Sequence, residues 1–469
     1  MKSIDNIEHQ IKTGNQKFIE SDLQPFLRIS SNTLNKEGIL RAKNFIITYI
    51  SSFCEEIKEY QGDINPLIMA KVKGNTQKSL LIYMMYDTQP INKEKEWISN
   101  PFGAEIHTLP SPLDILGNCI IARGAYNSKT PLLCFLSVVK ELKRNNELPL
   151  TLLLLFDGEE EIGSPSLLKI LENNKKILEN CSGVYYPSTK QSISGKSVLK
   201  LGYKGILSIT VNVSSINKEP HSAFSAMIPN PAVDLISLLN TIYTNNEFLI
   251  ESLKKPYNIS KEEHRLIDIL KKTFDIDEIK EKAGILNTSE NDLKNVFTNY
   301  LFNPTFNIST LKSGFLEEGT KNYVPNEAIC NIDIRFAHKI PVNVLFNEIK
   351  EKVEAFSQTS KSKIRLIKNN GHESSRISRN SVLVKSLIET AKNFGVVTEI
   401  WPIGAAAAPL SVMQNVLGLD FITGGLGIGG LAHSVNEFIQ YNSIINTRLA
   451  NYNFIKTYSQ LLENKNKGI

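Results

Sequence analysis

The segment LPLTLLLLFDGEEE, residues 148–161, decides the fold class of this chain of 469 residues. It joins a continuous apolar run to a dense group of carboxylates. A shorter segment of the same kind, KSLLIYMMYD at 78–87, ends in Asp87. Apolar runs of this length are typical of central parallel strands that are covered on both faces. Because TPLLCFLSVVKELKRN at 130–145 has the pattern of an amphipathic helix with Thr130 as its N-cap, we predict an α/β fold.

The middle of the chain has a different pattern. GILSITVNVSS at 205–215 and EAICNIDIRFA at 327–337 alternate apolar and polar residues, as half-exposed strands do. Helical stretches separate the two segments, which indicates an α+β domain with an antiparallel sheet. We therefore expect a discontinuous α/β domain at 1–204 and 373–469, interrupted by an inserted domain at 205–372.

Composition and charge exclude several classes of protein. The 41% hydrophobic and 22% charged residues are ordinary for a globular chain, and the net charge of +5 is spread without a basic tract, so we expect no nucleic-acid partner. No apolar run approaches the ~18 residues that span a bilayer, and the polar N-terminus does not resemble a signal peptide. Five scattered cysteines without a CxxC pair favour a reducing compartment over a disulfide framework or a cysteine zinc site. We expect a cytoplasmic protein without a membrane partner.

Acidic residues follow both apolar runs, where the strands of a doubly wound sheet bind their ligands. These are Asp87 and the cluster DGEEE at 157–161, whose mutual repulsion requires a nearby cation or raised pKa values. A solvated helix start explains the same cluster, since acids favour helix N-termini, and the residues alone do not separate the two interpretations. His433, which follows a glycine-rich stretch, and His221 in EPHSAFSA are further candidates, although a lone histidine is more often structural.

Seven motifs in order carry a resemblance to a known family. They are YDTQP, ARGAYNSK, GEEEIGS, GYKG, PHSA, GTKNYVP and AHSVNE, and they extend from about residue 78 to residue 440. This series resembles the di-zinc amidohydrolases of metallopeptidase family 20, which include carnosine dipeptidases, aminoacylases, acetylornithine deacetylase and glutamate carboxypeptidase. The dipeptidase branch is the most similar. The resemblance implies a zinc-exopeptidase-like catalytic domain with a mixed, mostly parallel sheet, interrupted by an α+β lid domain through which the chain forms a homodimer.

The resemblance also implies roles for residues of the catalytic domain. Asp87 matches the aspartate that orients a metal-binding histidine, and Glu160 matches the general base. Glu161 and His433 match ligands of the second metal ion. These roles imply a hydrolase of peptide or amide bonds that acts on small peptides or N-acyl amino acids.

Three residues of the lid domain match family positions as well. His221 matches the lid histidine that reaches the active site of the partner subunit. Asn322 and Arg335 match residues that contact a substrate carboxylate, a role that suits the planar fork of arginine. A solvent-facing arginine on an edge strand is an equally good interpretation of Arg335.

Three expected metal ligands are replaced. By the resemblance the first metal ion needs residues 85, 127 and 188, and these are Met85, Asn127 and Ser188. A thioether suits Cu(I) rather than Zn²⁺, a serine hydroxyl is a poor donor, and an amide cannot bridge two ions as a carboxylate does. We therefore expect no metal ion, or one divalent ion that is most simply zinc, and we argue against a di-zinc centre.

Three functions remain open at this point. The first is a hydrolase with at most one metal ion. The second is a pseudoenzyme with a degenerate metal site that binds a ligand or serves in assembly. The third is a metal-independent enzyme that uses Glu160 and His221.

Overall fold

The chain divides into two compact units. The structure, a computed structural model, describes residues 4–91, 93–273, 280, 285–288, 292–407 and 411–466. Unit 1 comprises Met1–Leu201, Ile377–Trp401 and Val412–Ile469, and unit 2 comprises Gly202–Arg376 and Pro402–Ser411. The insert expected at 205–372 therefore lies inside unit 2.

A six-stranded mixed sheet forms the centre of unit 1. Its order is β1 (Glu56–Tyr60), β2 (Leu67–Val72), β6 (Thr151–Asp157), β3 (Ser79–Met85), β7 (Val184–Pro187) and β18 (Phe421–Gly424). The four strands from β6 to β18 are parallel, whereas β1 and β2 run antiparallel at one edge. Every residue of β6 is buried. The prediction of an α/β fold with central buried strands is confirmed. These strands are central because their side chains are apolar on both faces, so both faces must be covered by other parts of the protein.

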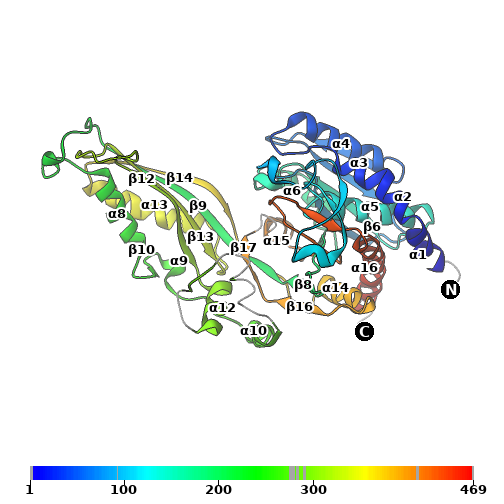
Figure 1. Ribbon diagram of the computed structural model, residues 1–469. Helices are drawn as coiled ribbons and strands as arrows, with labels where there is room; N and C mark the ends of the chain where they lie inside the picture. Colours follow the sequence, from blue (N-terminus) through cyan, green and yellow to red (C-terminus); the bar gives the residue numbers. More distant parts are fainter. Residues whose placement is uncertain are drawn as a thin grey trace. The chain divides into compact units, whose positions relative to one another are not determined.

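Helices cover this sheet. They are α1 (Ile4–Thr13), α2 (Asn15–Phe18), α3 (Gln24–Leu27), α4 (Lys36–Ile50), α5 (Lys129–Arg144), α6 (Leu167–Asn173), α7 (Lys175–Leu178), α14 (Val382–Asn393), α15 (Ser411–Leu417) and α16 (Ser443–Asn466). Helix α5 packs on β3 and β7, and α16 and α1 pack on α5 (Figure 1). The N-cap of α5 is Ser128 and not Thr130 as expected. The earlier start is compatible with Pro131, which still falls within the first turn, where its missing N–H costs no hydrogen bond.

Outside the central sheet, unit 1 also contains short strands and single helical turns. A four-stranded sheet has the order β19 (Gly429–Gly430), β20 (Phe438–Gln440), β5 (Asn118–Ile121) and β4 (Glu105–Thr108), and β8 (Ser197–Lys200) pairs with β16 (Thr398–Trp401). Single helical turns are η1 (Ile19–Leu23), η2 (Glu94–Glu96), η3 (Leu113–Leu116) and η4 (Glu160–Ile162). Because β5 pairs with β20, the loop that follows β5 lies beside the segment that precedes β20.

An antiparallel sheet forms the core of unit 2. Its path is β12 (Thr305–Ser313), β13 (Glu327–Phe336), β9 (Gly202–Ser214) and β14 (Lys363–His372), and β15 (Ser375–Arg376) and β17 (Gly404–Ala407) also pair with β9. Buried and half-buried residues alternate along β9 and β13, as the sequence pattern predicts. Helices α8 (Pro231–Ile242) and α13 (Val342–Thr359) pack on this sheet (Figure 1). The remaining elements are η5 (Ser222–Phe224), β10 (Tyr243–Thr244), β11 (Glu247–Phe248), α9 (Glu251–Lys254), α10 (Lys261–Thr273) and α12 (Leu293–Phe302).

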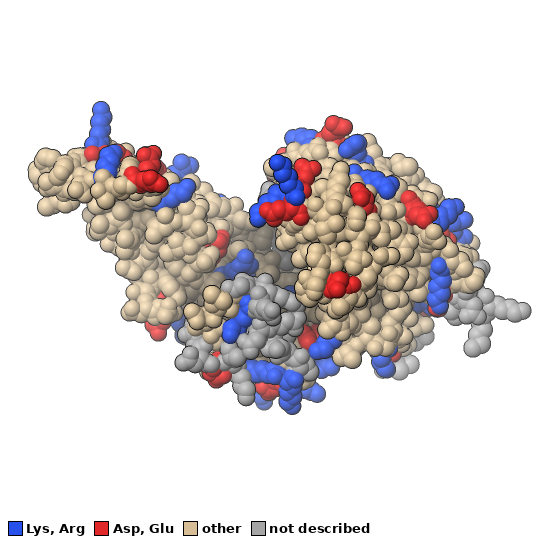
Figure 2. Space-filling model, viewed as in Figure 1, with Lys and Arg blue, Asp and Glu red and all other residues tan. Residues whose placement is uncertain are grey.

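Charged side chains of both signs are interspersed over the face of the molecule that Figure 2 shows. This distribution agrees with a net charge that is spread along the chain. Within the described ranges, none of the helices combines the length and the apolar composition that crossing a lipid bilayer requires.

Candidate active site

The candidate active site lies where the parallel strands of unit 1 end. Met85 is the last residue of β3 and pairs with Asp157, the last residue of β6. Strand β7 ends at Pro187, directly before Ser188. Because parallel strands bring their carboxyl ends to one edge of the sheet, Asp87 and the acidic cluster share this edge, as the sequence pattern predicts. Ser188, which only the resemblance singled out, lies at the same edge.

Two carboxylates of the acidic cluster are structural. Asp157 accepts hydrogen bonds from the Tyr83 hydroxyl at 2.8 Å and from the Glu159 backbone N–H at 2.8 Å. Glu159 in turn accepts three backbone N–H groups at 2.7, 2.8 and 3.1 Å. Burial raises the pKa of Asp157, in agreement with the expectation that raised pKa values compensate part of the cluster. This leaves Glu160 and Glu161 for the site.

Asp87 is buried with one oxygen satisfied and one not. Its Oδ2 accepts from the Thr33 hydroxyl and from the Glu161 backbone N–H, both at 3.0 Å, whereas its buried Oδ1 has no hydrogen-bond partner in the described part of the chain. Burial and the charges of Asp157 and Glu161 raise the pKa of Asp87. The resemblance pairs this carboxylate with a histidine at position 85. Met85 has no N–H to donate, so the unpartnered oxygen agrees with the loss of that histidine.

Glu161, Asn127 and His433 converge on one point. Asn127 Nδ2 lies 3.0 Å from Glu161 Oε1 and 3.3 Å from His433 Nε2, and His433 Nε2 lies 3.2 Å from Glu161 Oε2. Gln89 Nε2 donates to Glu161 Oε2 at 2.9 Å. The side chain of Glu161 is 5% exposed and that of His433 is 54% exposed, so the point opens to solvent on the histidine side. The hydrogen bond to Glu161 raises the pKa of His433.

These three side chains fit one tetrahedral metal ion. Zinc bonds of about 2.0–2.1 Å place tetrahedral ligand atoms about 3.3 Å apart, close to the separations of the three head groups. A rotation of the Asn127 amide by half a turn would present its oxygen in place of its nitrogen. The donor set would then be one carboxylate, one imidazole and one neutral carbonyl oxygen.

The first metal position does not fit zinc. Met85 is buried and offers a thioether, and the Ser188 hydroxyl is hydrogen-bonded to the Thr423 hydroxyl at 2.9 Å. Across the described residues there is no group of three His, Cys, Asp or Glu side chains that could hold a metal ion. The number of metal ions that this edge holds remains a prediction.

Glu160 and Lys190 supply the remaining charges. Burial raises the pKa of Glu160, as do the charges of Glu161, Asp87 and Asp157, whereas Lys190 acts in the opposite direction. Burial lowers the pKa of Lys190, and Glu160 opposes that shift. The charge of Lys190 thus partly offsets that of Glu160, and the sequence reasoning did not identify this lysine. Its position in PSTK, directly after β7, was the available signal.

A buried ion pair fixes the loop that carries Asn127. Arg123 Nη1 donates to Glu437 Oε2 at 2.8 Å, and both side chains are almost fully buried. Glu437 also accepts the backbone N–H groups of Gly124, Tyr126 and Asn127 at 3.0 Å each. Sequence reasoning missed this pair, although both residues stand in the quoted motifs ARGAYNSK and AHSVNE. The clamp joins the loop after β5 to the segment that precedes β20, which also carries His433.

The lid candidates lie in unit 2. His221 is exposed, its Nδ1 accepts the Ala223 N–H at 3.1 Å, and it forms an isolated bridge with Tyr323, so it lies beside Asn322. Arg335 is half-buried on β13, opposite Thr305. The structure therefore brings His221 and Asn322 together, and their roles toward a substrate remain predictions.

Fold and candidate site together define a peptidase-type α/β chain. Residues 81–457 match the model of peptidase family M20/M25/M40, and the chain belongs to this family. The resemblance inferred from the seven motifs is thus confirmed, as is the expected fold class.

Two of the similar curated proteins are named as dipeptidases. The chain is 25% identical to the Cys-Gly metallodipeptidase dug1 of Schizosaccharomyces pombe, over 66% of this chain and 64% of the relative. It is 23% identical to the Beta-Ala-His dipeptidase of Rattus norvegicus, over 62% of this chain and 58% of the relative. The chain thus spans less than two thirds of the length of either protein.

Solved structures of this family share the fold. An M20 family metallo-carboxypeptidase from Sulfolobus solfataricus is 27% identical, with a TM-score of 0.82 over 93% of this chain and 98% of that chain. Human carnosine dipeptidase 1 is 17% identical, with a TM-score of 0.73 over 97% of this chain and 99% of that chain, which shows the fold alone.

Proposed function

We propose that this chain is a hydrolase of dipeptides or N-acyl amino acids that works with at most one metal ion, held by Asn127, Glu161 and His433. The observation that carries the proposal is the convergence of these head groups within 3.0–3.3 Å of one another, at the sheet edge that also carries Glu160. The names of the dipeptidase relatives support the substrate class. Zinc is the ion that we propose, because carboxylate and imidazole are among its ordinary ligands.

Each residue of the site then has a defined task. A bound zinc ion would supply a water whose pKa is lowered toward ~7. Glu160 accepts a proton at the same edge of the sheet, and Lys190 offsets the negative charge of the carboxylates around it. Asp87 holds the backbone N–H of Glu161 and so fixes the orientation of that carboxylate. Within unit 2, Asn322 and Arg335 are proposed to contact the substrate carboxylate.

The test is zinc stoichiometry together with hydrolysis. Chelator-treated protein is titrated with zinc by calorimetry, and hydrolysis of Cys-Gly, β-Ala-His and an N-acyl amino acid is then measured. We expect one zinc ion per chain. Glu161→Ala should abolish zinc binding, whereas Glu160→Gln should keep zinc and lose hydrolysis. Glu172→Gln, an exposed glutamate on α6, is the matched control and should change neither.

Each other outcome assigns a different function. Two zinc ions per chain would contradict the count and require other ligands for the first position. Absence of both zinc and hydrolysis would identify a ligand-binding or assembly homologue. Hydrolysis without zinc that is lost in Glu160→Gln and His221→Ala would identify a metal-independent enzyme.

We also propose a cytoplasmic homodimer that forms through unit 2. Exposed apolar side chains support the dimer: Val233 and Ile236 on α8 are 56% and 55% exposed, and Leu311 on the edge strand β12 is 56% exposed. The scattered cysteines, all of them free thiols, fit a reducing compartment. Light scattering of the eluting protein should give twice the chain mass for the wild type and a smaller mass for Ile236→Asp. A monomeric wild type would refute the dimer.

A further inference from the structure

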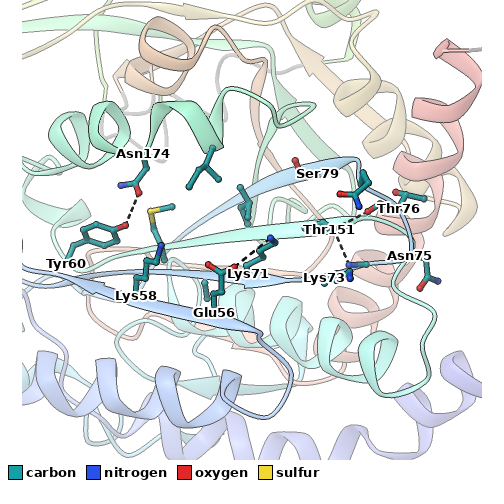
Figure 3. Close-up of a pocket in the computed structure, with 16 residues that line it drawn as sticks. Glu56, Lys58, Tyr60, Lys71, Lys73, Asn75, Thr76, Ser79, Thr151 and Asn174 are labelled. Atoms are coloured by element: carbon teal, nitrogen blue, oxygen red, sulfur yellow. Dashed lines mark hydrogen bonds and ion pairs between the residues drawn. The ribbon is translucent and has the colours of Figure 1, made fainter.

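We propose that unit 1 has a second small-molecule site, away from the candidate active site, that binds an organic anion with a flat apolar body. The site is a pocket of about 400 Å³, within the range of ligand-binding cavities. Strands β1 and β2 and the loop at 73–77 form its walls together with the starts of β3 and β6, Asn174, and Ile177 of α7 (Figure 3). Neither the seven motifs nor the proposed hydrolase function assigns a role to this pocket.

The pocket runs along β1 and β2, beside the central strands. One end reaches the starts of β3 and β6, where Ser79 and Thr151 line it. Lys58 lines the other part of the pocket and pairs with Met69 of β2, which in turn pairs with Leu155 of β6. None of the residues that line the pocket belongs to the candidate active site, so the two sites are built from different side chains.

The floor of the pocket is apolar. Met69 on β2 and Leu153 on β6 are buried, and Ile177 on α7 faces the same space. A flat apolar body that covers these side chains removes hydrocarbon surface from water, which is the main favourable contribution to binding in such cavities.

Several neutral polar groups of the wall are already hydrogen-bonded to the protein. The Tyr60 hydroxyl donates to Asn174 Oδ1 at 2.8 Å, a pair that Figure 3 shows at one end of the pocket. At the other end the Thr76 hydroxyl donates to the Pro149 carbonyl at 3.1 Å, and the Thr151 hydroxyl donates to the Thr76 carbonyl at 3.1 Å. These groups shape the wall and leave few donors for a neutral ligand.

Lysines supply the charged donors of the wall. Lys58, Lys71 and Lys73 line the pocket, and Glu56 is the only acidic side chain in its lining. Lys71 Nζ lies 3.8 Å from Glu56 Oε1, whereas Lys58 and Lys73 form no ion pair with another described side chain. Figure 3 shows Lys58 near Tyr60 and Lys73 near Asn75, with Lys71 between them. Three ammonium groups above an apolar floor select a ligand that carries an acidic group on a hydrophobic body.

Calorimetry with two matched probes tests the proposal. Naphthalene-2-sulfonate carries the acidic group, and naphthalene-2-sulfonamide has the same body without the charge. We expect the sulfonate to bind at one site per chain, about tenfold or more tightly than the sulfonamide, and to weaken as salt is raised. Lys58→Ala/Lys73→Ala should reduce the sulfonate affinity about tenfold and leave the sulfonamide unchanged.

The controls separate this site from the rest of the molecule. Lys36→Ala/Lys95→Ala removes two exposed lysines that do not line the pocket and should bind both probes as the wild type does. Glu160→Gln should also bind the sulfonate normally, so that failure of the hydrolase proposal leaves this result unaffected. Equal affinity for the two probes, or equal loss of binding in both lysine variants, would overturn the proposal. Absence of sulfonate binding to the wild type would overturn it as well.

Discussion

Substitution of Asn127 by aspartate tests whether Asn127, Glu161 and His433 form a metal site or only a hydrogen-bonded group. In the wild type Asn127 Nδ2 lies 3.0 Å from Glu161 Oε1, and the carboxylate of Glu161 is almost fully buried. Asn127→Asp replaces this donor with a second carboxylate at the same separation. Without a metal ion the change removes a charge-assisted hydrogen bond and adds like-charge repulsion. With a zinc ion between them, the same two carboxylates are both ligands.

The magnitude follows from the distance. Two unit charges 3.0 Å apart repel by about 5 kcal/mol at an effective dielectric constant of ~20, and the lost hydrogen bond is worth about 1.5–3 kcal/mol. Relaxation toward solvent on the side of His433, which is 54% exposed, reduces the sum. We expect Asn127→Asp to be about 4 kcal/mol less stable than the wild type in chelator, or roughly 8 °C lower in Tm.

The assay is thermal unfolding in chelator and in zinc, combined with zinc titration. Zinc should restore the stability of Asn127→Asp and should bind it at least tenfold more tightly than the wild type, a difference of about 1.4 kcal/mol. Asn380→Asp, an exposed asparagine of unit 1, is the control and should leave both measurements unchanged. If Asn127→Asp matches the wild type in chelator and in its response to zinc, the three head groups do not converge as described.

Two further predictions concern buried charges. Glu437→Gln leaves the buried guanidinium of Arg123 without its counterion, and we expect urea denaturation to show that the free energy of unfolding falls by about 3–5 kcal/mol. An unchanged denaturation midpoint would contradict a stabilising role of the Arg123–Glu437 ion pair. Burial and the charges of Arg335 and Arg376 hold the pKa of Lys204 down to about 7, so the folded chain binds fewer protons than the unfolded chain between that pH and the ordinary lysine pKa. Stability should therefore rise with pH in this window, by about 2–3 kcal/mol more from pH 7 to pH 9 in the wild type than in Lys204→Met, and parallel profiles of the two proteins would refute this.

Local patterns predicted the elements that position the candidate site. The runs that become β3 and β6 are apolar throughout because both faces of a central strand are buried, and no distant residue is needed to see this. The alternation in β9 and β13 likewise follows from a sheet with one buried face. The start of α5 was missed, because both Ser128 and Thr130 are suitable capping residues and only the geometry of the preceding loop selects one.

The candidate site was predictable only in part. From the resemblance alone we predict that Met85, Asn127 and Ser188 stand where metal ligands are expected, and this assignment remains a prediction. The sequence does not show which acids of the cluster face the site. Asp157 and Glu159 accept hydrogen bonds from residues of other segments, and only the folded structure brings those residues together.

The sequence by itself therefore determined the α/β class and the antiparallel sheet of unit 2. Only the tertiary structure decided that the charge of Lys190 acts on Glu160, that Arg123 pairs with Glu437 and that three lysines line a pocket on β1 and β2. The physical reason is the distance along the chain over which each effect acts. Burial and periodicity act on neighbouring residues, whereas Arg123 and Glu437 are 314 residues apart and meet only because β5 pairs with β20.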